Sequence, residues 1–121
     1  MSEPIRTNQA HFSVAVALQR LTATNEKPFI KLFEHGSLQV EIYVPRGPNG
    51  ELVDLQKPHT RDELYVIASG VGFFFNGTAR QACQTGDLIF VPAGVPHHFE
   101  EFTENFSTWV MFYGPEGGEN T

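Results

Sequence analysis

The sequence predicts an all-β protein, an antiparallel β-sandwich or barrel, and three observations support this fold class. From residue 28 onward, apolar and polar residues alternate with a period of two in one short segment after another. The 11 glycines and 8 prolines supply frequent turns, and the 11 phenylalanines favour strands. No long helical pattern alternates with the predicted strands, which excludes a parallel α/β sheet.

The first 27 residues are expected to form an N-terminal segment. Residues 1–10 are polar, and we expect them to be mobile. Between residues 13 and 21 the apolar spacing favours a short helix slightly over an edge strand. The residues that would share one face of this helix are Val14, Ala17, Leu18 and Leu21.

Residues 28–113 are expected to form the main domain, with about eight strands separated by turns. The expected strands are 29–34, 38–44, 64–68, 71–75, 79–83, 88–91, 97–102 and 106–113. Asn76-Gly77 is the strongest hairpin signal in the chain. The segment from Pro45 to Pro58 holds four turn formers and is expected to be an exposed loop, of the kind that often borders a functional site. Residues 114–121 are expected to form a flexible acidic tail.

Composition narrows the range of functions. The 121 residues suffice for one domain, and 8 Lys and Arg against 14 Asp and Glu give a net charge of −6. No basic run is visible, so neither a nucleic acid nor an anionic membrane is an expected partner. Cys83 is the single cysteine and allows no internal disulfide. With no recognisable signal sequence or membrane-spanning run, we expect a cytoplasmic protein.

Three residues distant in sequence could hold a metal. His59 and Glu63 lie four residues apart and would share a face if this segment is extended. His97 opens a later predicted strand. Two imidazoles and one carboxylate form a facial triad suited to iron(II) or manganese(II), with positions left for substrate or dioxygen. Spacing alone does not establish that they converge, and a solvated rim or an ordinary polar pair is the alternative.

Two motifs resemble those of the cupin superfamily. Residues 59–63, His-Thr-Arg-Asp-Glu, followed by six residues to Gly70, resemble the first cupin motif. The second motif is matched by Gly86, Pro92, Gly94 and His97. The sequence is therefore identified as similar to small bacterial single-domain cupins. The resemblance implies a jelly-roll fold, a divalent ion (Fe, Mn, Ni or Zn), a small-molecule ligand and a homodimer.

The metal ligands of such cupins would fall on Lys57, His59, Glu63 and His97, and Lys57 departs from the pattern. An ammonium holds its proton at neutral pH and is a poor ligand, since binding a metal costs both a proton and solvation. The resemblance thus gives three clear ligands: His59, Glu63 and His97.

The departure at Lys57 leaves several interpretations open. Lys57 can turn aside while three ligands hold the metal, or Gln56 or Asp54 can restore a fourth ligand through a local bulge. Alternatively, Lys57 pairs with Glu63 and replaces the metal, so that the pocket binds a small molecule directly. A Schiff base between a desolvated Lys57 and a carbonyl is a less favoured variant.

Two hypotheses follow for function. The first is a metal-binding cupin, extending to an enzyme of the dioxygenase, isomerase or lyase class in which the metal polarises a carbonyl or enolate oxygen or binds dioxygen. The second is a metal-free binding module in which Lys57 contacts the ligand. His98 should face away from His97, and the numerous phenylalanines are more often core than the lining of a cavity.

Overall fold

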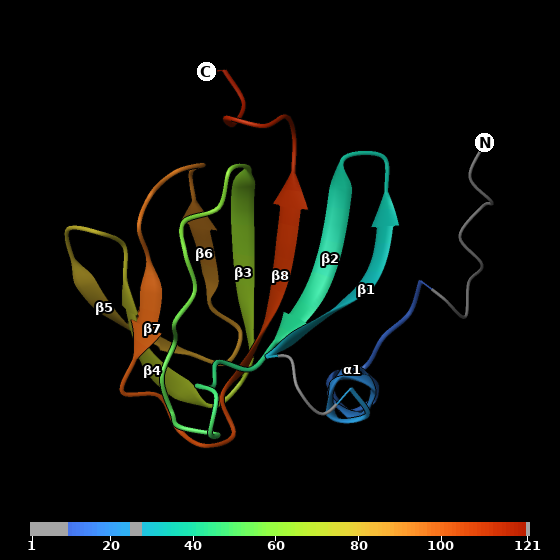
Figure 1. The fold of residues 1–121 in the computed structure, drawn as a ribbon, viewed down its shortest axis with the longest axis vertical. Coiled ribbons are helices and arrows are strands. Elements are labelled where there is room, and N and C mark those ends of the chain that lie inside the picture. Colours follow the sequence, from blue (N-terminus) through green and yellow to red (C-terminus); the bar gives the residue numbers. More distant parts are fainter. Residues whose placement is uncertain (1–9, 25–27, 121) are drawn as a thin grey trace.

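The computed structural model describes residues 10–24 and 28–120 (Figure 1). In this part of the chain one helix precedes eight strands, which confirms the predicted all-β class and the short N-terminal helix. The elements are α1 (Val14–Thr22), β1 (Phe29–His35), β2 (Leu38–Tyr43), β3 (Asp62–Ser69), β4 (Val71–Phe75), β5 (Arg80–Gln84), β6 (Leu88–Val91), β7 (His98–Glu100) and β8 (Ser107–Tyr113). Most of the expected mobile N-terminal segment, residues 1–9, lies outside the described residues.

The helix α1 forms because its sequence combines a cap with an apolar face. The Ser13 hydroxyl accepts a hydrogen bond from the Val16 backbone N–H at 3.1 Å, which satisfies one of the free donors of the first turn. Ala17 and Leu21, four residues apart, are buried against Ile42 of β2. A helix rather than an edge strand therefore covers this side of the sheet.

The strands form two antiparallel sheets. The larger has the order β1-β2-β8-β3-β6, and the smaller has the order β5-β4-β7. Figure 1 shows α1 beside β1, and the smaller sheet at the opposite side of the molecule. Strands distant in sequence, such as β2, β3 and β8, are neighbours, so residues from separate parts of the chain come together on one face.

Side chains on the two faces of the larger sheet have different neighbours. Ile42 on β2 packs toward α1 together with Trp109 of β8. The alternate residues, including Glu41 and Tyr43, line a cavity whose other walls come from β3, β8 and residues 55–59. Between the two sheets the packing is aromatic, with ring centroids about 5 Å apart. This aromatic cluster contains Tyr65, Phe74, Phe99, Phe102 and Phe106.

The start of β3 differs from the sequence expectation. The strand begins at Asp62, two residues before the predicted start at Leu64. Asp62 accepts hydrogen bonds from the backbone N–H groups of Ala93 (3.0 Å) and Glu119 (2.8 Å), which fix the beginning of the strand and lower the pKa of Asp62. The earlier start places Glu63 within the sheet, opposite both Val91 and Phe112.

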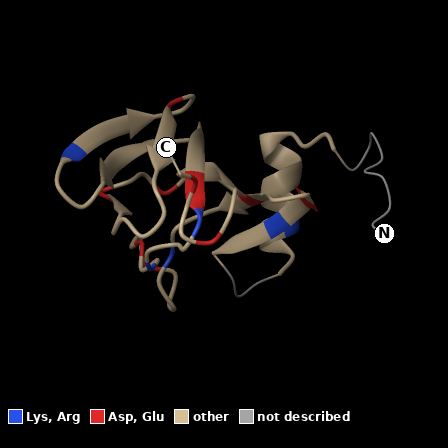
Figure 2. Ribbon diagram, turned by 90° about the horizontal axis from the view of Figure 1, so that it is seen from above, with Lys and Arg blue, Asp and Glu red and all other residues tan. Residues whose placement is uncertain are grey.

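Turns and loops agree closely with the sequence. Asn76 accepts backbone hydrogen bonds from Thr78 and Ala79, and Gly77 has a φ of 96°, so the expected hairpin is confirmed. Residues 44–61 contain neither helix nor strand. No helix in the described ranges has the length and hydropathy to cross a membrane. Lys and Arg lie at separated positions along the ribbon (Figure 2).

Candidate metal centre and ligand pocket

The structure brings His59, Glu63 and His97 together from three different segments. His59 lies near the end of the long loop before β3, Glu63 is the second residue of β3, and His97 immediately precedes β7. Each side chain offers one ligand atom, and all these atoms lie within 4.8 Å of one another. In the described part of the chain the three residues form a cluster of metal-ligating type.

Glu63 lies at the centre of this cluster. Its Oε1 is 3.0 Å from Nε2 of His97, and its Oε2 is 3.7 Å from Nε2 of His59. The side chain is 1% exposed, yet neither oxygen accepts a well-directed hydrogen bond from any described residue. A buried carboxylate without a directed donor is costly, because it has lost hydration without replacement. The environment of Glu63 therefore fits a bound cation.

His97 is oriented by a hydrogen bond on the side opposite Glu63. Its Nδ1 lies 2.7 Å from the Val95 carbonyl, which can only accept, so Nδ1 carries the proton and donates. In the neutral ring Nε2 then holds a lone pair, as a metal ligand requires. Burial opposes the charged ring, but the adjacent Glu63 carboxylate and the Val95 carbonyl outweigh it and raise the pKa of His97.

His59 is more exposed and forms the outer side of the cluster. Its ring packs edge-on against Phe112 with centroids 4.7 Å apart. Burial lowers the pKa of His59, although the charge of Glu63 acts in the opposite direction. The neutral imidazole, which is the form that binds metals, is thereby favoured. His98, by contrast, faces away and contacts Glu100 and Phe75, as predicted for the neighbour of His97.

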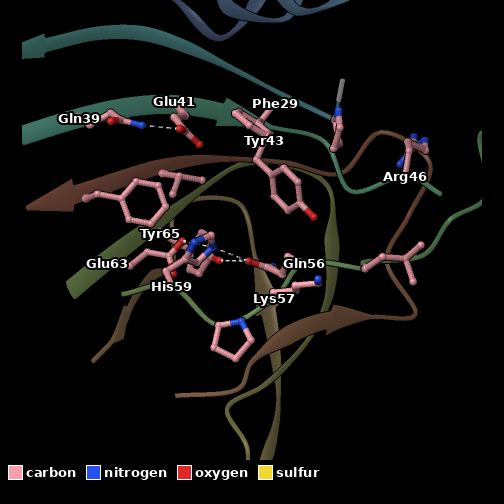
Figure 3. Close-up of a pocket in the computed structure, with 15 residues that line it drawn as sticks. Phe29, Gln39, Glu41, Tyr43, Arg46, Gln56, Lys57, His59, Glu63 and Tyr65 are labelled. Carbon is pink, nitrogen blue, oxygen red and sulfur yellow. Dashed lines mark hydrogen bonds and ion pairs between the residues drawn. The ribbon is translucent and has the colours of Figure 1, made fainter. Parts of the chain in front are cut away.

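Lys57 lies on the wall of the cavity but outside the cluster. It is exposed, and within the described residues it forms no ion pair, including with Glu63. The predicted alternative in which Lys57 neutralises Glu63 is therefore not the arrangement observed. Figure 3 shows the amine of Lys57 directed away from the His59 ring.

Gln56 and Asp54 connect the loop to the cluster. The Gln56 amide nitrogen donates to Oδ2 of Asp54 at 2.5 Å, and its Oε1 lies 3.2 Å from Nε2 of His59. The Tyr65 hydroxyl donates to the same Gln56 oxygen at 2.9 Å and lies 3.0 Å from Nε2 of His97. Gln56 and Tyr65 thus bridge the two histidines.

A cavity of about 500 Å³ opens beside the cluster. Its lining includes His59, Glu63 and Tyr65, whereas His97 lies behind Glu63. The cavity walls are mixed in character, with apolar, cationic and acidic side chains. Further lining residues are Phe29, Gln39, Glu41, Tyr43, Arg46, Leu55, Lys57, Val110 and Phe112. This volume suits a small organic molecule.

Sequence reasoning missed Glu41 and Tyr65 as residues of the pocket. Glu41 is 7% exposed, and burial raises the pKa of its carboxyl. Figure 3 shows it across the cavity from His59, with the Gln39 amide donating to it at 2.7 Å. The alternation in residues 38–44 was visible, but period two does not say which face points inward. Tyr65 lies two residues after Glu63, on the same face of β3.

Fold and site together define a small antiparallel jelly-roll protein with a His–Glu–His cluster beside a cavity. The cupin domain family (Cupin_2) matches residues 45–112, which is more than half of the chain and includes both motifs. The chain therefore belongs to the cupin domain family, and the predicted resemblance is confirmed.

Comparisons with individual proteins agree with this assignment. An uncharacterised protein of Streptomyces coelicolor is 29% identical over 82% of this chain and 91% of its own length. Acireductone dioxygenase from Citrobacter koseri is 39% identical over 49% of this chain, and the match spans 36% of that enzyme. A solved cupin 2 conserved barrel domain protein from Salinispora arenicola has a TM-score of 0.61 and 16% identity, covering 76% of this chain and 83% of that one.

Proposed function

We propose that this protein is a metal-binding cupin in which His59, Glu63 and His97 hold one divalent ion and the adjacent cavity binds a small molecule. One observation carries the proposal. The buried carboxylate of Glu63 lies between two imidazole Nε2 atoms, and neither of its oxygens accepts a well-directed hydrogen bond from a described residue. Iron, manganese, nickel and zinc all accept such nitrogen and oxygen ligands.

The cavity walls support a substrate with both an apolar part and an oxygen-rich part. A bound divalent ion would supply Lewis-acid or redox chemistry to a carbonyl or enolate oxygen. Lys57 and Arg46 place positive charge on the wall, and Arg46 donates to the carbonyls of Pro45 and Glu104 rather than to a carboxylate. Leu55 and Phe112 offer apolar surface. These groups suit a small enolisable molecule or organic acid.

Glu41 is the group best placed to hold a proton in this cavity. The Gln39 amide donates to Oε2, and Figure 3 shows the other oxygen directed into the cavity. Because burial raises the pKa of Glu41, the protonated form is favoured relative to that of an exposed glutamate. A protonated Glu41 can donate to a substrate oxygen, and its ionised form can accept a proton back.

The partial similarity to acireductone dioxygenase supports an oxidoreductase of the dioxygenase type as the enzyme class. The match covers about a third of that enzyme, so the isomerase and lyase classes remain alternatives for the assay. Oxygen consumption with enolisable substrates is the first activity to measure, and loss of that activity in Glu41→Gln is expected.

A metal-free binding module is the second candidate, and the hydrogen bonds of the cluster favour it. Nε2 of His59 has Gln56 as a partner and Nε2 of His97 has Tyr65, so both rings have protein neighbours without an ion. Lys57 on the cavity wall would then contact an anionic ligand directly.

Elemental analysis of untagged protein, purified without chelator, separates the two candidates. About one metal per chain is expected, with loss in His59→Ala and in His97→Ala. His98→Ala is the matched control, because His98 neighbours His97 in sequence but faces away from the cluster. Absence of metal from the native protein, with metal gained by Lys57→His, would favour the binding module instead.

We also expect a homodimer in the cytoplasm, on the family resemblance and the sequence composition. Light scattering coupled to size-exclusion chromatography tests the dimer, and fractionation of the source cells tests the location. A single-chain mass across the accessible concentration range would contradict the dimer.

A further inference from the structure

The first cupin motif lacks a histidine at position 57, and a neighbouring amide occupies the space beside the cluster. We propose that the amide oxygen of Gln56 is the fourth protein ligand of the metal, and that Asp54 holds this amide in place. The inference rests on the metal site proposed above and specifies how the chain compensates for Lys57.

The orientation of the Gln56 amide follows from its partner. The amide group ends 2.5 Å from Oδ2 of Asp54, and an ionised carboxylate can only accept hydrogen bonds. The NH₂ end of the amide must therefore face Asp54, which leaves Oε1 facing His59 and Tyr65. The reversed amide would place two acceptors against each other.

Asp54 is itself held firmly, so the amide has a fixed support. Asp54 is 8% exposed and receives hydrogen bonds from the Tyr43 hydroxyl (2.5 Å), the Phe99 backbone N–H (2.9 Å) and the Gln56 backbone N–H (3.1 Å). These donors belong to β2, β7 and the loop, so one carboxylate ties the loop to both sheets. A metal ligand oriented by such a partner binds more tightly than a free one.

Around Nε2 of His59 there are more hydrogen-bond acceptors than donors. Nε2 of His59 faces Oε1 of Gln56 at 3.2 Å and Oε2 of Glu63 at 3.7 Å, and both oxygens can only accept. The Tyr65 hydroxyl occupies one lone pair of the Gln56 oxygen and leaves the second for another partner. A cation satisfies Gln56, Glu63 and His59 together, whereas one ring proton satisfies a single oxygen.

The separations between these atoms also fit a shared ion. Ligand atoms about 2.1 Å from one metal, in octahedral or tetrahedral geometry, lie roughly 3.0–3.5 Å apart. Two separations fall in this range, 3.0 Å between His97 and Glu63 and 3.2 Å between His59 and Gln56, while His59 and Glu63 are slightly further apart at 3.7 Å. The Gln56 oxygen therefore lies at ligand spacing from His59.

Cobalt(II) titration of metal-free, untagged protein tests the proposal, because affinity and the visible absorption bands both report on the ligand set. Gln56→Met removes the oxygen and keeps the side-chain length. We expect it to weaken cobalt binding about tenfold or more and to shift the absorption bands. Lys57→Met is the matched control, expected to keep affinity within about twofold and leave the spectrum unchanged.

Two different results would overturn the inference, and they separate the role of Gln56 from the existence of the metal site. Wild-type affinity and spectrum in Gln56→Met would show that the amide is not a ligand while the three-residue site stands. No cobalt binding by the wild type at all would remove the metal site, and the inference with it.

The role of Asp54 as a positioning residue has its own test. Asp54→Ala removes the acceptor of the Gln56 NH₂ group, so the amide is no longer held and cobalt binding is expected to weaken. In the Gln56→Met background there is no amide to orient, so adding Asp54→Ala is expected to weaken cobalt binding no further. Thermal unfolding without metal monitors the fold of each variant. An equal loss of affinity in both backgrounds, with the fold intact, would contradict the positioning role.

Discussion

Strand β3 and the loop of residues 44–61 lie on the same cavity, but they present their side chains by different means. β3 is hydrogen-bonded to β8 on one side and β6 on the other, so the pleat fixes the direction of Glu63 and Tyr65. The loop has no strand partner, and hydrogen bonds through Asp54 fix the direction of Gln56. In the proposed metal site the strand would thus supply the charged ligand, and the loop would supply the neutral groups of His59 and Gln56.

The two halves of the site differ in how much change they tolerate. A residue on a central strand cannot move without breaking two ladders of hydrogen bonds, so Glu63 is preorganised. A loop can exchange one ligand for a neighbouring one by a local shift, which is how Gln56 can stand in for a histidine at position 57.

Replacing Glu63 by glutamine is expected to have the largest effect. The buried charge attracts the cation, and the neutral amide does not, so metal-induced stabilisation should disappear. At a metal concentration of 100 times Kd the wild type should gain about 2.7 kcal/mol of unfolding free energy. Thermal unfolding with and without manganese measures the gain. Glu34→Gln, at an exposed ion pair on β1, is the control and should keep it. An equal gain in Glu63→Gln would contradict the central role of the carboxylate.

Replacing Tyr65 by phenylalanine removes the hydroxyl that joins strand and loop. Without it the Gln56 oxygen loses a donor and His97 loses a neighbour. We expect metal affinity to fall about tenfold and the unfolding free energy to fall by about 1 kcal/mol. Isothermal titration calorimetry measures the first and chemical denaturation the second. Tyr113→Phe, at the end of β8, serves as the control, and equal affinities in both variants would argue against the link.

Replacing Glu41 by glutamine should stabilise the metal-free protein near neutral pH. The pKa of Glu41 is raised in the fold, so its favourable contribution is present below the unfolded pKa and is lost as pH rises through the folded value. Glutamine stays neutral, so the variant should have the higher Tm at pH 7 and a similar Tm well below pH 4.5. A wild-type Tm above that of the variant at pH 7 would reverse the sign. Asp62→Asn should show the opposite trend, with a Tm below that of the wild type at pH 7. The pKa of Asp62 is lowered in the fold, so its stabilising contribution is present at pH 7 and is lost as the pH falls through the folded value.

Replacing Leu55 by serine should have the smallest effect. The Leu55 side chain is 62% exposed on the loop, so its loss should change the unfolding free energy by less than about 0.5 kcal/mol. Because Leu55 lines the cavity, affinity for an apolar ligand should fall instead. A clear loss of unfolding free energy in Leu55→Ser, measured by chemical denaturation, would show instead that Leu55 contributes to the packed core.

The fold was predictable because local rules and burial agree along most of the chain. Alternation and turn residues predicted strands wherever the structure has them, and Asn76-Gly77 forms the expected hairpin. The strand boundaries were less accurate near the site. β3 begins earlier because Asp62 binds backbone groups of Ala93 and Glu119, which are remote in sequence. Local patterns contain no information about such partners.

The two histidines and the glutamate of the candidate site could be predicted from the sequence. His59, Glu63 and His97 follow from motif spacing, and the structure places them within reach of one ion. Glu41 escaped prediction because β2 has a polar and an apolar face, and either can point inward. The apolar residue Ile42 packs under α1, so the polar face lines the cavity.

The sequence alone was enough to predict the β-rich class, the turns and the three motif residues His59, Glu63 and His97. These depend on backbone preference, on period-two patterning and on motifs within short segments. Only the folded chain places Lys57 outside the cluster, turns the Gln56 oxygen toward it and brings Glu41 into the cavity. These outcomes depend on contacts that are distant in sequence: Asp54 orients Gln56 and receives hydrogen bonds from both sheets, and the packing of Ile42 under α1 turns Glu41 toward the cavity.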